Sequence, residues 1–454
     1  MPVRLIESLA TTEPLAAIFS DESVLQAMLD FEVALARAEV RAGIVPQTAA
    51  EHIASVAHAG NFDVAALAHD MLRAGTVAIP VVKALREKVR PRNVDAAGWV
   101  HWGATSQDVS DTAIILLLKR CEPILLEDLK RLEQALVRLS EQHKDAIMLG
   151  RTLMQAAPPV TFGLKAAGWM GAAHRDGLRL RAAFSEALIL QFGGASGTLA
   201  SLGAHGVAVA HTLAEELGLH LPDAPWHAHR DRMANLLCCC GVLTGSLGKM
   251  ARDISLMMQN EIAEVAEPGG KGRGGSSTMP HKQNPIACLL TLGAAERVPG
   301  LVATYLSGMV QEHERGLGNW QSEWPIISSI IQSTALAISS MAEVAEGLSV
   351  NPKRMRQNLE NTNGLIFAER AMVVLATKAG RDTAQKLIDD AVRKSIAENK
   401  HLAAALADIP EAAAHLKSDL LQKLEVPEQY LGSAEVFRKA LIDSSTAENP
   451  KREQ

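Results

Sequence analysis

The sequence has few aromatic residues for its size. Of its 454 residues only 4% are aromatic, whereas 48% are hydrophobic. This balance favours helices that pack closely on one another over an aromatic-rich β-sandwich. The chain is also too long for one small core, so two or three domains are expected.

Cysteine is scarce as well, and its five positions do not form a disulfide framework. Cys238, Cys239 and Cys240 are consecutive, so on a helix they point in different directions and cannot pair with one another. With Cys121 and Cys288, they are expected to be small core residues in a reducing compartment. A metal–thiolate site needs spaced pairs of cysteines, and the sequence has none. The cysteines therefore predict no metal–thiolate site.

Strong charge and targeting signals are missing too. The net charge of -6 is mild and the charges are interspersed, which argues against nucleic acid or an anionic membrane as a partner. No long apolar run follows the first five residues, so no signal peptide is expected. We also find no uncharged run of about 18 apolar residues, and therefore expect no membrane span. The sequence predicts a soluble cytoplasmic protein that binds anions through a few placed cations.

Helical periodicity dominates the chain. Leucines recur at spacings of three and four from Leu125 to Leu139, with charged residues between them. Four more segments share this pattern: residues 162–188, 233–265, 286–315 and 326–348. They are much longer than the average globular helix of about 11 residues. Several are apolar on more than one face, so the sequence predicts an all-α bundle of long helices that other copies of the chain help to bury.

Turn residues divide the chain into three predicted helical domains: residues 1–111, 112–350 and 351–454. The second boundary follows from Asn351-Pro352, which is typical of a turn. Beyond it we expect shorter helices, broken at Gly380, Pro410 and Pro427. A short strand is predicted at residues 151–154, and the final residues, 448–454, are expected to fray.

The most informative segment is residues 275–285, which read Gly-Ser-Ser-Thr-Met-Pro-His-Lys-Gln-Asn-Pro. It follows a glycine-rich run that cannot hold a fixed helix or strand. A lid that closes over a small anion could use such a loop to exclude water and to deliver a hydroxyl and a cation together. A solvated surface loop is the alternative for this composition.

Three further segments carry the donor types that bind carboxylates, on separate parts of the chain. They are residues 101–108, 150–158 and 312–324. Together with the loop, they supply the predicted substrate-binding residues: His101, Thr105, Ser106, Arg151, Thr152, Gln155, His281, Lys282, Asn284 and Arg315.

Other roles remain open for several of these residues. Arg315, predicted to end a long helix, could simply cap it, and Arg151 could form an ion pair between subunits. His281 could order the loop instead of contacting substrate. His227 and His229 fit a solvated turn better than a metal pair. Trp320 and Trp324 are expected to serve in packing.

At these motifs the sequence resembles the fumarase/aspartase superfamily. The signature Gly-Ser-Ser-x-Met-Pro-x-Lys-x-Asn-Pro is matched throughout residues 275–285, and Thr-Ser-x-Asp is matched at residues 105–108. A Gly-x-x-Gly-Thr run occupies residues 194–198, and Tyr430-Leu431-Gly432 is similar to the end of the adenylosuccinate-lyase branch.

The resemblance implies an all-helical homotetramer of three-domain chains, in which each active site draws segments from three subunits. It also implies that Ser276, beside Ser277, exchanges a proton next to a substrate carboxylate, through an aci-carboxylate intermediate. Lys282 and Asn284 would hold that carboxylate, and Thr105 and Ser106 would bind another. A serine of ordinary pKa is a poor base, so nearby cations and backbone N–H donors must favour its alkoxide.

One departure from the superfamily distinguishes between its branches. Many members carry a histidine after Gly-Arg-Thr that acts as acid for the leaving group, whereas this chain has Leu153 there. A leaving amine needs a proton, but a leaving carboxylate, with a conjugate-acid pKa of about 4, needs none. Leu153 therefore favours the lactonizing (cycloisomerase) branch, which acts on a tricarboxylate and, as the resemblance implies, needs neither a metal nor an organic cofactor. An adenylosuccinate- or argininosuccinate-type lyase is the main alternative; an aspartase-like lyase and an inactive structural protein fit less well.

Overall fold

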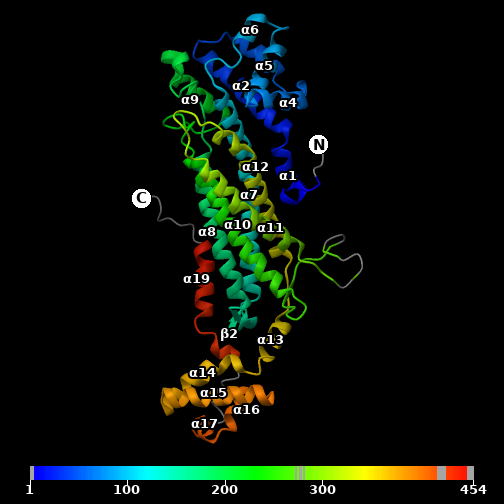
Figure 1. Ribbon diagram of the computed structural model, residues 1–454, viewed down its shortest axis with the longest axis vertical. Helices are drawn as coiled ribbons and strands as arrows, with labels where there is room; N and C mark the ends of the chain where they lie inside the picture. The colour runs from blue at the N-terminus through cyan, green and yellow to red at the C-terminus, as the bar shows by residue number, and fades with distance from the viewer. Residues whose placement is uncertain (1–4, 271–273, 276–278, 280–281, 417–425, 447–454) are drawn as a thin grey trace. The chain divides into compact units, whose positions relative to one another are not determined.

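The computed structural model describes residues 5–270, 274–275, 279, 282–416 and 426–446. The described chain is predominantly helical and has two small antiparallel sheets, which confirms the all-α prediction (Figure 1). By its internal contacts it divides into two units, neither of them continuous in sequence. The first unit is residues 1–130, 175–248 and 290–340, and the second is residues 131–174, 249–289 and 341–454.

Five long helices each contribute residues to both units: α7 (Ser106–Gln142), α8 (Phe162–Ala187), α10 (Asp231–Met257), α11 (Ile286–Ser307) and α12 (Asn319–Gly347). The predicted division at residues 111 and 350 cuts the chain into three consecutive domains and not into units of internal contact, so it stays a prediction. α12 does end at Gly347, and the side chain of Asn351 caps the next helix by accepting from the Arg354 N–H at 3.0 Å.

The first unit also contains shorter helices, most of them near the N-terminus. They are α1 (Glu13–Ile18), α2 (Asp21–Arg41), α3 (Gln47–Val56), α4 (Val64–Ala74), α5 (Ala78–Val89), α6 (Val94–Gly98) and α9 (Gly206–Leu217). α2 packs against α3 and α9. Its start is set by Ser20, whose hydroxyl accepts from the Ser23 N–H, and by two acidic residues in its first turn.

The second unit contains the C-terminal helices and the strands. The helices are α13 (Pro352–Glu360), α14 (Ala368–Ala379), α15 (Arg381–Glu398), α16 (Leu402–Ala407), α17 (Pro410–His415) and α19 (Ala434–Thr446). The strands are β1 (Ile147–Thr152), β2 (Gln155–Thr161), β3 (Val265–Ala266) and β4 (Ser349–Val350). α14 to α17 pack around one apolar cluster and lie together in Figure 1. The predicted breaks at Gly380, Pro410 and Pro427 are confirmed.

All five predicted long-helix segments lie on observed helices, but two of them extend several residues past the end of the helix. The helix predicted over residues 286–315 ends at Ser307, so Arg315 lies on a loop and the prediction that it ends a helix is wrong. Gly308, Gly316 and Gly318 disfavour helix there, and His313 and Gly318 adopt φ of 48° and 91°. Similarly, α10 ends at Met257 and not near residue 265.

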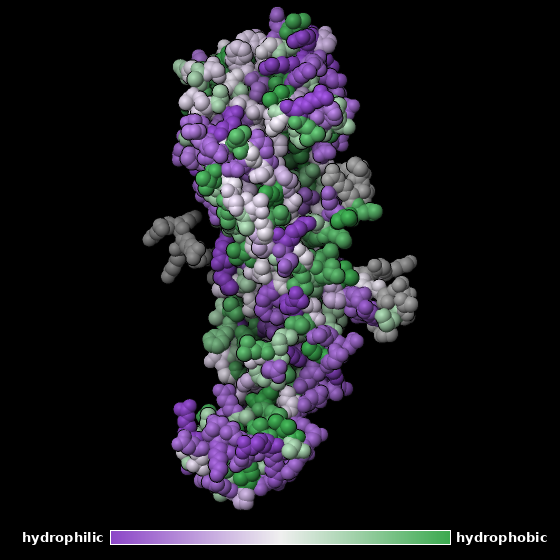
Figure 2. Space-filling model, in the orientation of Figure 1, coloured by the Kyte–Doolittle hydropathy of each residue, from purple (hydrophilic) through white to green (hydrophobic). Residues whose placement is uncertain are grey.

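The long helices are strongly apolar. By length and composition alone, α10, α11 and α12 are long and apolar enough to cross a membrane. The sequence criterion missed them because it required an unbroken run of uncharged apolar residues, whereas a helix of this kind can include up to two charged residues in 18. Only 33% of the most apolar window of α11 is buried within the chain. Figure 2 accordingly shows hydrophobic side chains at the visible surface. Val242, Leu289 and Leu306 are among the exposed large hydrophobic residues.

Candidate active site

The predicted Thr105–Ser106 turn lies in the first unit, at the start of α7. Ser106 is the first residue of that 37-residue helix. Free backbone N–H groups and the positive end of the helix dipole are therefore available at this turn. An anion bound there would gain both effects.

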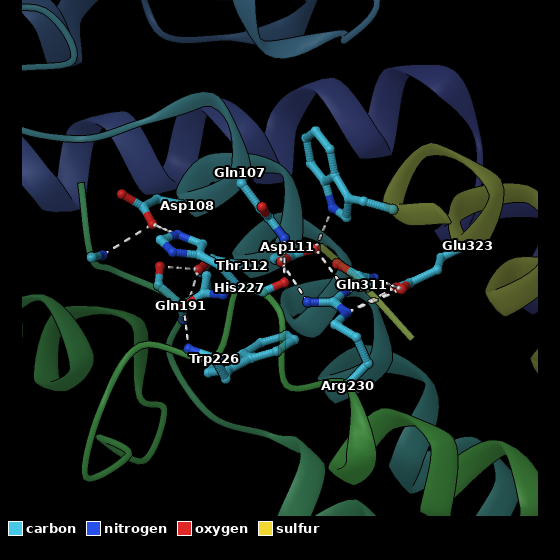
Figure 3. Close-up of polar contacts among 12 residues, drawn as sticks. Gln107, Asp108, Asp111, Thr112, Gln191, Trp226, His227, Arg230, Gln311 and Glu323 are labelled. Atoms are coloured by element: carbon cyan, nitrogen blue, oxygen red, sulfur yellow. Dashed lines mark hydrogen bonds and ion pairs between the residues drawn. The ribbon is translucent and has the colours of Figure 1, made fainter. Parts of the chain in front are cut away.

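Asp108 fixes the shape of this turn. Its buried carboxylate accepts from the backbone N–H groups of Thr105 (3.0 Å), Gly193 (3.0 Å) and Gly194 (2.9 Å), and lies 2.7 Å from Nε2 of His227. The contact with Gly194 joins the turn to the Gly-x-x-Gly-Thr loop. Figure 3 shows the contact of Asp108 with His227. Gly193 is needed because a Cβ there would lie 2.9 Å from Cε1 of His227.

His227 was not predicted as part of this site. We expected it in a solvated turn, and that expectation is wrong, because its side chain is 4% exposed and bonded to Asp108. His229 is exposed, as expected. The only signal in the sequence was the Thr-Ser-x-Asp motif, which identifies Asp108 but not its partner.

Arg315 approaches the same turn from the loop between α11 and α12. Its Nη1 donates to the hydroxyl of Thr105 at 3.0 Å, and its Nη2 donates to the carbonyl of Ala195 at 3.0 Å. Both acceptors are neutral, and Nε is buried without a partner. No carboxylate of the described chain forms an ion pair with Arg315, so its charge is available to an anion at the turn. It does not cap a helix, the alternative left open by the sequence.

A buried ionic network lies beside the contact of Asp108 with His227 (Figure 3). Arg230 donates to Asp111 at 2.8 and 3.1 Å and to Glu323 at 2.6 to 3.1 Å, and all three side chains are 1% exposed. The indole of Trp320 also donates to Asp111, so this tryptophan is a core residue, as predicted. Burial lowers the pKa of Arg230, but the two carboxylates raise it well above its usual value. The network thus joins α7 and α12 to the residue that directly precedes α10.

His101 completes the cluster in the first unit. It adopts a left-handed backbone conformation with φ of 62°, and its Nδ1 lies 2.6 Å from a carboxylate oxygen of Glu32 on α2. The first unit therefore brings together four of the predicted residues: His101, Thr105, Ser106 and Arg315.

The hairpin of β1 and β2 carries three more predicted residues, in the second unit. Thr152 pairs with Gln155, and the two-residue turn between them is Leu153–Met154, with φ of 50° and 66°. Positive φ at both positions is the geometry of a tight hairpin turn. The side chain of Leu153 is 97% exposed, at the tip of the hairpin.

Arg151 is already paired within the chain. Its guanidinium donates to both carboxylate oxygens of Glu264, at 2.7 and 2.9 Å, and Asn358 donates to the same carboxylate at 2.9 Å. Glu264 is buried and the Arg151 side chain is 28% exposed. The ion pair is thus internal and not between subunits, and a role for Arg151 in binding substrate stays a prediction.

The signature loop belongs to the second unit. Ser276, Ser277 and His281 lie outside the described residues. Asn284 donates its N–H to the carbonyl of Gly274 at 2.9 Å, and Gly275 pairs with Gln283. Lys282 is exposed and Asn284 partly buried.

Glu267 anchors this loop at its base. Its buried carboxylate accepts from the backbone N–H groups of Ala287 (3.1 Å) and Cys288 (2.8 Å), in the first turn of α11. The chain before the glycine-rich run is thereby joined to the helix that follows the signature loop. In the part of the chain that the structure describes, no cluster of three His, Cys, Asp or Glu residues is suited to a metal.

Comparison with known proteins agrees with these motifs. The family described as "Lyase" matches residues 7–300, and "Adenylosuccinate lyase C-terminus" matches residues 364–440. The 3-carboxy-cis,cis-muconate cycloisomerase of Bradyrhizobium diazoefficiens is 46% identical over 97% of this chain and 98% of its own. That of Pseudomonas aeruginosa is 45% identical over 98% and 96%. The crystal structure of the 3-carboxy-cis,cis-muconate lactonizing enzyme from Pseudomonas putida superposes with a TM-score of 0.91, at 43% identity over 98% of this chain and 99% of the other.

Proposed function

This chain belongs to the lyase family of the fumarase/aspartase superfamily, and we propose that it interconverts 3-carboxy-cis,cis-muconate and 4-carboxymuconolactone, a step of protocatechuate degradation. The observation that carries this proposal is the uncompensated charge of Arg315 at the Thr105–Ser106 turn. A cation with only neutral partners, beside a helix N-terminus, suits a substrate carboxylate. The muconate has three carboxylates, for which Lys282, His101 and Arg151 are the other proposed counter-charges.

In the lactonizing direction a carboxylate oxygen of the muconate attacks the ring-closing carbon. A C–O bond forms, one C=C bond is lost, and its electron pair moves toward the neighbouring carbon and the carboxylate on it. Ser276 then gives that carbon a proton as general acid; in reverse, its alkoxide removes the proton. Lys282 and Asn284 would bind the carboxylate whose charge grows at the transition state, which is where binding lowers a barrier.

The hairpin tip supports this reaction over an elimination of an amine. Leu153 and Met154, at its turn, can donate no proton from their side chains. A carboxylate leaves without help from an acid, whereas an amine does not.

We further propose that the enzyme is a cytoplasmic homotetramer with active sites shared between subunits. The low burial of α11 within one chain supports this assembly, because so apolar a helix needs a cover. Other copies of the chain would provide it.

Ultraviolet absorbance tests the proposed reaction directly. Ring closure removes one of two conjugated double bonds, so the pure protein should cause a fast fall in the diene absorbance of 3-carboxy-cis,cis-muconate. Ser276→Ala should abolish it, and should leave circular dichroism unchanged. An unchanged absorbance with wild type would refute the proposal.

The alternative is an adenylosuccinate- or argininosuccinate-type lyase, which the match of residues 364–440 to an adenylosuccinate-lyase C-terminus favours. The same assay with adenylosuccinate and argininosuccinate distinguishes the two. Turnover of either one, without turnover of the muconate, would mean that another residue supplies the leaving-group proton that Leu153 cannot.

A further inference from the structure

Helix α2 carries two buried glutamates on one face. Glu32 and Glu39 are seven residues apart, and they are 2% and 0% exposed. Neither carboxylate oxygen of Glu39 has a partner. Burial, and then the charge of Glu32, raise the pKa of Glu39 to about 9. Glu39 is therefore protonated at neutral pH.

Glu32 differs because it has a partner. Its Oε1 lies 2.6 Å from Nδ1 of His101, the short distance of a charge-assisted hydrogen bond. The side chains of Glu32 and His101 are 1% and 13% exposed. Nε2, the other ring nitrogen of His101, has no hydrogen-bond partner among the described residues. His101 lies four positions before Thr105 in the chain.

The protonation state of His101 decides what Nε2 offers. In a neutral ring whose Nδ1–H is bonded to Glu32, Nε2 is a lone-pair acceptor that repels a carboxylate. In the protonated ring Nε2–H is a donor with a positive charge.

We propose that Glu32 is a positioning residue, which keeps His101 protonated through Nδ1 so that Nε2–H is available to a carboxylate bound at the Thr105–Ser106 turn. The identity of that carboxylate as part of the muconate rests on the proposed function. The contact between Glu32 and His101 is observed in the structure and does not depend on that function.

The surrounding charges support this role. Burial lowers the pKa of His101, but the charge of Glu32, its hydrogen bond and the charge of Asp108 raise it above its ordinary 6.5. Arg86 of α5, which donates to the carbonyl of Val100, opposes them. Glu32 is the largest of the groups that favour the charged ring, so its removal should lower the pKa of His101.

The chain offers a matched pair of variants for a test. Glu32→Gln keeps the shape and an acceptor for Nδ1–H but removes the charge. Glu39→Gln changes the same helix face at equal burial but removes no charge, because Glu39 is already protonated. Calorimetry of butane-1,2,4-tricarboxylate binding between pH 6 and 8, where Glu39 stays protonated, then reports on the ring without requiring turnover.

Wild type and Glu39→Gln should lose affinity together as the pH rises through the pKa of His101. Glu32→Gln should lose affinity at lower pH than wild type, by a factor that grows with pH and approaches about tenfold above the pKa of His101 if that pKa falls by about one unit. A purely structural role for the ion pair would lower thermal stability without moving this pH profile.

Two results would overturn the proposal: the same pH profile in Glu32→Gln and wild type, or no binding of the tricarboxylate by wild type at pH 6. If Glu32→Gln does not fold, Glu32→Asp replaces it, since it keeps the charge at a longer distance and should give an intermediate shift. Turnover of the muconate by wild type is measured separately, so failure of the proposed function is distinguished from failure of the role of Glu32.

Discussion

Arg315 is the residue on which substrate binding should depend most clearly. A guanidinium that contacts only the Thr105 hydroxyl and the Ala195 carbonyl keeps its charge for a ligand. A hydrogen bond to a charged group contributes about 1.5–3 kcal/mol. Arg315→Gln should therefore lower kcat/KM for the muconate by about 10- to 100-fold, mainly through KM.

Arg41→Gln is the control for this change. Arg41 is also an arginine of the first unit, but it forms an exposed ion pair with Glu216 on α9. Its loss should leave both kinetic constants unchanged. Equal effects of the two substitutions would show that Arg315 acts through stability and not through the substrate.

Glu39 gives a second prediction at this scale, on stability against pH. Its pKa is about 9 in the folded chain, well above the 4.5 that is ordinary for a glutamate. Between these values the folded state keeps a proton that the unfolded state has lost, so stability falls as the pH rises, by at most about 1.4 kcal/mol per pH unit. Glu39→Gln removes this loss.

Urea unfolding at pH 5.5 and 8.5 measures the difference. Glu39→Gln should gain stability relative to wild type at the higher pH. If the two proteins lose stability in parallel, Glu39 is not protonated in the folded state, and the variant no longer serves as the uncharged control for Glu32→Gln.

At the scale of elements, the anchor of the signature loop is the feature that should control catalysis. Glu267 precedes the glycine-rich run that leads into the signature loop, and its carboxylate accepts from two backbone N–H groups in the first turn of α11. Glu267→Ala leaves those groups without a carboxylate, and should lower kcat about tenfold or more because a loosely held loop misplaces its serine and lysine.

Circular dichroism and KM separate this effect from general damage. Helix content and assembly should remain as in wild type. A protein that loses its helices or its quaternary structure would mean that Glu267 serves folding and not the loop.

The sequence predicted elements well where a single periodicity governs them. α8 and α12 follow from their apolar spacing, and the breaks at Gly380 and Pro410 follow from residues that cannot continue a helix. It failed where the apolar spacing runs on past the helix, as between Ser307 and Arg315, because Gly308 and the left-handed His313 interrupt the helix without changing the apolar spacing.

The candidate site was only partly predictable for a different reason. Thr105, Ser106 and Arg315 stand in recognisable motifs, and the structure brings them together. Glu32 and His227 do not, because their partners are 69 and 119 residues away in the chain. From the sequence, a glutamate on the apolar face of a helix only departs from the expected pattern. The fold is needed to show that Glu32 contacts the imidazole of His101.

On the scale of the whole molecule, the apolar surface of the long helices leads to a prediction about assembly. With 33% of its apolar window buried in one chain, α11 should be covered by other copies. Light scattering after size-exclusion chromatography should give the mass of four chains, without detergent. A monodisperse monomer would contradict the proposed tetramer.

If active sites are shared between copies, two variants impaired in different segments should complement each other. Ser276→Ala damages the signature loop, and Arg315→Gln damages the turn at α7. When the two are unfolded together and refolded, random assortment places an intact loop from one chain beside an intact turn from another in about a quarter of the sites. At muconate concentrations well below KM, turnover should therefore return toward about a quarter of the wild-type rate, while each variant refolded alone stays low. Recovery of assembly without recovery of turnover would show that the loop and the turn of each site come from the same chain.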